Sequence, residues 1–192
     1  MAIDCDITVA GLQSACDVPL DTSPPYWVVD VLLYNNEPTA TSLGAFNFRI
    51  EDLDLARLDP PDMVFPFEGP CVSPHYDCNP NFNEAGMSDP DWGCGLPRPT
   101  DDISPAVGDQ TFISCFNISS GGPVIPAMSS LLLARVVYII PPGATLGTVP
   151  LDLTSASNAF DNIGIEILDC DGGPCFDAAI TLVAPVNPSS EF

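Results

Sequence analysis

The sequence predicts an all-β protein, and three observations lead to that prediction. The chain holds 22 prolines and 14 glycines, spread so that almost no window of helical length is free of them. The segments between them are rich in Val, Ile, Leu, Phe and Thr, which favour strands. Nine such segments, separated by turn residues, indicate a β-sandwich or barrel. The candidate strands are Asp6–Ala10, Tyr26–Asn35, Ala45–Glu51, Leu53–Leu58, Gln110–Ile118, Leu131–Ile140, Thr148–Thr154, Ile163–Leu168 and Phe176–Val183.

Alternation within three of these segments predicts which side chains enter the core. In each segment every second residue is apolar, while the other set contains Asp30, Arg135 or Arg49. The inward sets are expected to be Trp27, Val29, Val31 and Leu33; Leu132, Ala134, Val136, Tyr138 and Ile140; and Phe46, Phe48 and Ile50. The outer faces of the first two segments are also unusually apolar, which indicates central strands or a face that is covered.

Length and charge exclude several classes of protein. A chain of 192 residues is long enough to bury a core, so we expect a single domain spanning residues 1–192. Four arginines, no lysine and 26 acidic residues give a formal net charge of −22, which repels nucleic acid and anionic lipid. The 46% of hydrophobic residues argues against a disordered acidic tail.

The eight cysteines indicate a protein exposed to an oxidising, extracellular environment, either secreted or on a cell surface. Sequence neighbours form four candidate disulfides, and 105 pairings remain open. The candidate pairs are Cys5–Cys16, Cys71–Cys78, Cys94–Cys115 and Cys170–Cys175. The longest apolar run, Leu131 to Pro142, contains Arg135 and is too short to cross a bilayer, so no membrane insertion is expected. No signal peptide precedes Asp4, which suggests that one has been removed.

Residues 60–109 form a proline- and cysteine-rich insertion with little strand-like alternation. We expect a long, ordered loop excursion held by disulfides. Its aromatic residues Tyr76, Phe82 and Trp92 are the candidates for carbohydrate contact, although they are scattered.

Enzymatic chemistry is not predicted. The single histidine, His75, lies in a proline-rich stretch of the insertion, and a Ser-His-Asp or Cys-His nucleophile needs its histidine on a rigid scaffold. The cysteine spacings do not match zinc sites. Paired carboxylates exist by number alone, without a cleft signature.

Calcium is the one ion that the sequence suggests, and no cofactor is required. Asp169 and Asp171 stand beside two glycines and offer hard oxygen ligands. The same residues also fit a plain tight turn closed by a Cys170–Cys175 disulfide, and the sequence favours the turn. A second, weaker set of ligands lies in the insertion and contains Asn79, Asn81, Glu84, Asp89 and Asp91.

Two polar features point to the surface. Asn47 and Arg49 lie on the outward side of Ala45–Glu51, where they form either an ordinary solvent-exposed surface or the centre of a partner-binding face. Asn117, in Asn117-Ile118-Ser119, is an acceptor sequence for N-glycosylation near a strand end.

Two apolar motifs carry a resemblance to a known family. The first runs through Gly44, Ala45, Phe46 and Phe48 to Leu55 and Leu58, and the second comprises Leu133, Ala134, Val136, Tyr138, Gly143, Leu151 and Leu153. In these motifs, and in the closing segment 161–183, the chain resembles cohesin domains, particularly the cysteine-bearing cohesin-like domains of secreted bacterial proteins.

The resemblance implies a nine-stranded jelly-roll β-sandwich without catalytic activity. Cohesins bind dockerin modules through a sheet face, and related sandwiches bind carbohydrate. We therefore expect a non-catalytic extracellular recognition or scaffolding module whose partner is a dockerin-like protein or a copy of itself. The alternatives are a carbohydrate-binding module and a filament or surface-layer subunit that exchanges its terminal segments Met1–Ala10 and Ala184–Phe192 as strands.

Overall fold

The computed structural model describes residues 1–23, 25–51, 57–58, 92–99, 110–117, 122–171 and 173–185. Within these ranges the chain forms thirteen strands and no helix. The strands are β1 (Ala2–Asp4), β2 (Ala15–Pro19), β3 (Tyr26–Asn35), β4 (Thr41–Ser42), β5 (Ala45–Glu51), β6 (Trp92–Pro99), β7 (Gln110–Asn117), β8 (Val124–Ile125), β9 (Ser129–Ile139), β10 (Gly147–Leu153), β11 (Asn158–Phe160), β12 (Glu166–Asp169) and β13 (Ala178–Val183). The prediction of an all-β sandwich is confirmed.

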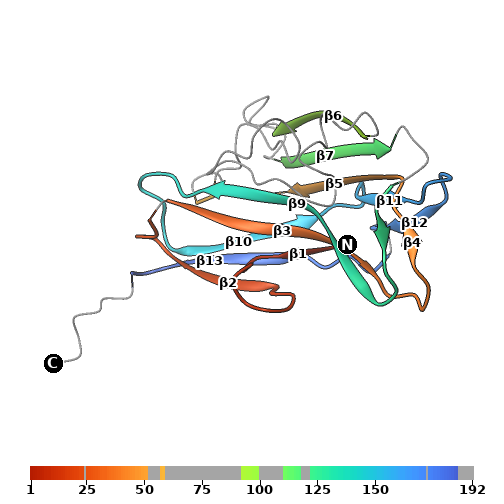
Figure 1. Cartoon of the computed structure of the whole chain (residues 1–192). Coiled ribbons are helices and arrows are strands. Elements are labelled where there is room, and N and C mark those ends of the chain that lie inside the picture. Colours follow the sequence, from red (N-terminus) through yellow and green to blue (C-terminus); the bar gives the residue numbers. More distant parts are fainter. Residues whose placement is uncertain are drawn as a thin grey trace.

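Two sheets enclose the core. The smaller sheet has the order β1-β3-β9. In the larger sheet one edge of β5 pairs with both β10 and β11, and its other edge pairs with β7, which continues to β6. Strands β13 and β2 extend the sheet beyond β10, and β12 extends it beyond β11. Figure 1 shows β6, β7 and β5 side by side at the top, with β9 and β3 below them.

The core is formed by the inward sides of both sheets. Val29 and Val31 of β3 are fully buried, as are Phe48 and Ile50 of β5. The rings of Phe46 and Phe48 stack with their centroids 6.4 Å apart. The inward sets predicted for β3 and β5 are therefore confirmed, with Trp27 only partly buried against the core.

The inward set predicted for β9 needs one correction. A register shift lies between Val31 and Leu32 of β3, which pair with Ala134 and Leu132, so that Leu133 of β9 lies at a β-bulge. Leu133 is fully buried, whereas Leu132, which alternation assigned to the core, is half-buried. A β-bulge of this kind shifts the side-chain phase by one residue.

The predicted strand Asp6–Ala10 is wrong, because these residues form turns between β1 and β2. The carboxylate of Asp6 accepts hydrogen bonds from the backbone N–H (3.0 Å) and the hydroxyl (2.6 Å) of Thr8. The backbone N–H of Val9 donates to the carbonyl of Asp6. This side-chain capture of the backbone is a typical alternative to strand pairing.

The other predicted bounds agree to differing degrees. Tyr26–Asn35 and Ala45–Glu51 match β3 and β5, and most later strands differ by one or two residues at an end. Strand β12 begins at Glu166, so the start predicted at Ile163 is wrong by three residues. The carboxylate of Asp161 accepts hydrogen bonds from the backbone N–H groups of Ile163 and Ile165 and holds residues 161–165 in a turn. The predicted strand Leu53–Leu58 lies mostly outside the described residues.

The insertion contains a strand that alternation did not predict. β6 spans Trp92–Pro99 and pairs antiparallel with β7. Backbone pairing to a neighbouring strand requires no hydrophobic alternation, so this glycine- and proline-rich stretch carried little signal.

Two of the candidate disulfides are confirmed. Cys5–Cys16 has a Cα separation of 5.9 Å and Cys170–Cys175 one of 5.4 Å. Cys115 is also disulfide-bonded, and the register of β6 and β7 places Cys94 directly opposite it. Cys71 and Cys78 lie outside the described residues.

Candidate functional site

Outward-pointing side chains of the larger sheet form the candidate site, which we call the β5 outer face. Strand register brings residues from five strands into transverse rows, because directly opposed residues share a face. The members are Ala45, Asn47, Arg49 and Glu51 of β5, Phe112, Ser114 and Phe116 of β7, Asn158 and Phe160 of β11, Glu166 and Asp169 of β12, and Asp152 of β10.

The first row is aromatic. Phe116 lies opposite Ala45, which lies opposite Phe160. The side chain of Phe116 is 51% exposed. Its partner on β6 is Gly93, which has no side chain to cover the ring. An aromatic ring of this exposure in the middle of a sheet is available for contact with another molecule.

The second row is made of amides. Asn47 lies between Ser114 of β7 and Asn158 of β11. The Nδ2 group of Asn47 donates a hydrogen bond to Oδ1 of Asn158. This bond orients the two amides with respect to each other and leaves further donor and acceptor capacity on both, since each amide has two donors and a carbonyl oxygen.

Arg49 stands on the next row, where β5 changes its edge partner from β11 to β10. The hydroxyl of Ser157, which is fully buried, accepts the backbone N–H of Arg49 at 2.9 Å. The backbone N–H of Thr154 donates to the carbonyl of Arg49 at 2.9 Å. Ser157 and Thr154 thus complete the backbone hydrogen bonds of β5 at the junction and hold Arg49 in place.

The far end of the face is acidic. Asp152 of β10 lies opposite Glu51 of β5, and Asp177 precedes β13 nearby. Partial burial, with the negative charges of Asp177 and Glu51, raises the pKa of Asp152. The Asp177 carboxylate also accepts the backbone N–H of Leu153 at 2.8 Å. Along β5 the face therefore changes from aromatic through amide and guanidinium to carboxylate, while Glu166 and Asp169 of β12 add a carboxylate at the outer end of each of the first two rows.

The structure brings together only some of the predicted site residues. Asn47 and Arg49 both lie on the β5 outer face, as predicted, and their contact with a partner stays a prediction. Asn117 is the last residue of β7, and the rest of its glycosylation sequence lies outside the described residues. Trp92 begins β6 opposite Asn117, whereas Tyr76, Phe82 and His75 are outside the described residues.

The predicted calcium turn is held by its own hydrogen bond, in which the Asp169 carboxylate accepts the backbone N–H of Asp171 at 2.8 Å. The part of the chain that the structure describes has no group of three or more His, Cys, Asp or Glu side chains arranged to hold a metal ion. Calcium binding here stays a prediction.

Sequence reasoning missed Phe116 and Phe160. Alternation could have placed Phe116 outward, because it directly follows the inward-facing Cys115 on β7. Only the register of β7, β5 and β11 shows that the rings of Phe116 and Phe160 flank Ala45.

No helix among the described residues is long and apolar enough to span a lipid bilayer.

Comparison with known proteins identifies the fold. No protein-family model matches the chain, and no curated protein sequence matches it. The seventh ScaB type I cohesin from Pseudobacteroides cellulosolvens is similar in structure, with a TM-score of 0.55 at 12% identity over 100% of this chain and 96% of that one.

Two further solved structures resemble the chain in the same way. The sixth cohesin of scaffoldin B from Acetivibrio cellulolyticus, in complex with a Cel5 dockerin, gives a TM-score of 0.52 at 13% identity, over 95% of this chain and 96% of that one. A type I cohesin–dockerin complex from Clostridium thermocellum gives 0.51 at 13% identity, over 95% and 100%. The chain has a cohesin-like jelly-roll fold, and the predicted fold resemblance is confirmed.

Proposed function

We propose that the protein is a non-catalytic recognition module that binds a protein partner through the β5 outer face. The partner we expect is a dockerin-type module, since two of the cohesins with this fold were solved in complex with dockerins. The cysteine usage, with the disulfides Cys5–Cys16 and Cys170–Cys175, supports an extracellular or cell-surface location.

The exposed ring of Phe116 beside the Asn47–Asn158 amide pair is the observation that supports this function. Protein interfaces are enriched in aromatic and arginine side chains, with hydrogen-bonding groups around them. The β5 outer face offers an aromatic row, an oriented amide row and Arg49 on adjacent rows. A partner can therefore bury a ring and form specific hydrogen bonds in one contact.

Isothermal titration calorimetry with a panel of purified dockerin modules tests the proposal. We expect at least one module to bind, and Phe116→Asp to weaken that binding at least about tenfold, because it puts a charge where the partner buries a ring. Val124→Asp is the matched control, since Val124 is 61% exposed on β8, away from this face. It should bind as the wild type does.

Two results would overturn the proposal. One is that no module binds the oxidised protein. The other is that Phe116→Asp binds as tightly as Val124→Asp while both variants keep the thermal unfolding midpoint of the wild type, which would show that the contact lies elsewhere.

A further inference from the structure

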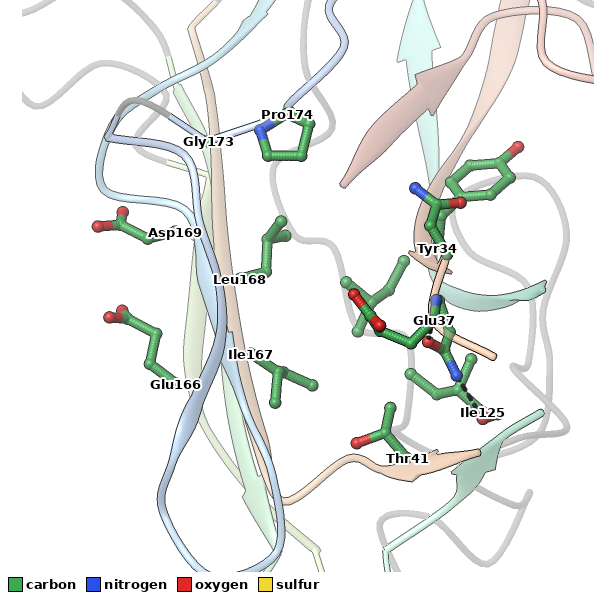
Figure 2. Close-up of a pocket in the computed structure, with 13 residues that line it drawn as sticks. Tyr34, Glu37, Thr41, Ile125, Glu166, Ile167, Leu168, Asp169, Gly173 and Pro174 are labelled. Atoms are coloured by element: carbon green, nitrogen blue, oxygen red, sulfur yellow. Dashed lines mark hydrogen bonds between the residues drawn. The ribbon is translucent and has the colours of Figure 1, made fainter. Parts of the chain in front are cut away.

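A pocket of about 510 Å³ lies between the C-terminal end of β3 and the strand β12. We call it the mouth pocket. Figure 2 shows Ile167 and Leu168 pointing from β12 into it, and Glu37 projecting toward them from the opposite side. The side chains of Glu166 and Asp169 point away from it. The remaining lining comes from the end of β3, from β4 and β8, and from Gly173 and Pro174.

Hydrogen bonds and a disulfide hold both walls of the mouth pocket. On one side, the Nδ2 group of Asn35 donates to the carbonyls of Thr39 (2.9 Å) and Ile125 (3.1 Å). The Oδ1 atom of Asn35 accepts the backbone N–H of Glu37 at 3.1 Å, which holds the backbone that carries this carboxylate. On the other side, the disulfide Cys170–Cys175 closes the turn that follows β12. A pocket with fixed walls loses little conformational entropy when it binds a ligand.

From this geometry we propose that the mouth pocket binds an extended segment of a partner protein that carries a lysine or arginine. The aliphatic stem of such a side chain can pack on Ile167 and Leu168, while its charged head meets Glu37. Among the described residues that line the pocket there is no lysine, arginine or histidine, so none of them neutralises Glu37.

Three observations support a segment of another protein as the occupant. The chain has no lysine and a net charge of −22, so a second copy is both poor in cations and strongly repelled. A single lysine would not fill 510 Å³, a volume typical of pockets for larger ligands. Among the described strands, β12 is the last in the sheet order, so its outer edge can pair with an extended peptide.

This inference does not rest on the proposed function. The side chains of Phe116 and Asn47 do not line the mouth pocket. Either site can therefore be correct without the other, and the variant Phe116→Asp separates them.

The test uses two synthetic pentapeptides, acetyl-Val-Lys-Val-Lys-Val-amide and its glutamate counterpart, titrated into the isotopically labelled full chain. We expect the lysine peptide alone to bind and to shift the backbone amide resonances of residues 33–41 and 166–169. Glu37→Gln should weaken the lysine peptide about fivefold to tenfold, by the loss of a charge-assisted hydrogen bond. The matched control Asp17→Asn removes one negative charge from an exposed position on β2 and should leave the affinity unchanged.

Other outcomes overturn the proposal. Shifts spread over the whole acidic surface, or equal weakening in Asp17→Asn and Glu37→Gln, would mean general charge attraction. Spermidine that binds the same residues as tightly as the peptide would mean a small polycation site instead of a peptide site. Phe116→Asp should leave peptide binding unchanged, and a loss there would mean that the peptide occupies the β5 outer face.

Discussion

The outward faces of the two sheets handle their charges in opposite ways. On the β1-β3-β9 sheet, Asp30 and Arg135 are directly opposed, and two parallel hydrogen bonds of 2.7 and 3.0 Å join guanidinium to carboxylate. On the β5 outer face, partial burial raises the pKa of Asp152, and the negative charges of Asp177 and Glu51 raise it further. On the first face Arg135 pairs with Asp30, and the neighbouring Asp4 carboxylate accepts backbone N–H bonds from Asp6 and Gln13. The carboxylate of Asp152 on the second face instead carries an electrostatic cost. This difference supports the β5 outer face as the proposed contact surface for a partner.

Removing the guanidinium of Arg135 should produce the largest effect. The side chains of Arg135 and Asp30 are 26% and 13% exposed, so the pair is largely shielded from water. Arg135→Met keeps an aliphatic side chain and leaves Asp30 as an unpaired charge. We expect the free energy of unfolding, measured in urea at pH 7, to fall by about 2 to 3 kcal/mol, less than for a fully buried pair.

The double variant Asp30→Asn/Arg135→Met is the control for this pair. It removes both charges and should recover more than half of the lost stability, since the penalty comes from the isolated carboxylate. If the double variant is as unstable as the single one, the lost stability comes from packing. The ion pair of Asp30 and Arg135 then does not stabilise the outward face of the β1-β3-β9 sheet.

A smaller loss is expected on the other face from Ser157→Ala. In the wild type, the backbone N–H of Arg49 donates a hydrogen bond to the hydroxyl of the fully buried Ser157. The substitution removes that acceptor. We expect about 1 to 2 kcal/mol of destabilisation in the same urea measurement. Ser155→Ala, at an exposed site two residues away, should change the stability little. Equal effects of the two substitutions would show that the hydroxyl does not support the junction of β10 and β11.

How much could be predicted from the sequence differs between the two faces of one strand. The inward set Phe46, Phe48 and Ile50 follows from alternation alone, because burial selects apolar residues every second position. The outward position of Asn47 and Arg49 follows from the same pattern. Their neighbours do not, since Asn158 lies 111 residues further along the chain and meets Asn47 only through strand register.

Backbone effects account for the remaining failures. The bulge at Leu133, the turn held by the Asp6 carboxylate and the turn held by Asp161 each depend on a local hydrogen bond or register shift that hydrophobic alternation does not record. The mouth pocket was also beyond prediction, because its walls come from β3 and β12, which join different sheets.

The smallest predicted effect tests the electrostatic cost of the β5 outer face. Because the pKa of Asp152 is raised in the folded protein, folding favours its protonated form, and its unfavourable contribution is present at neutral pH and disappears as pH falls through the folded pKa. Asp152→Asn should therefore raise the free energy of unfolding at pH 7 by a few tenths of a kcal/mol, with a slight rise in the thermal midpoint. At pH 3.5 the substitution should leave the midpoint nearly unchanged. Thermal unfolding at both pH values measures this difference, with Asp17→Asn as the control for net charge. An equal gain in the two variants at pH 7 would mean that the stabilisation comes from the lower total charge of the molecule, and that the cluster around Asp152 adds no cost of its own.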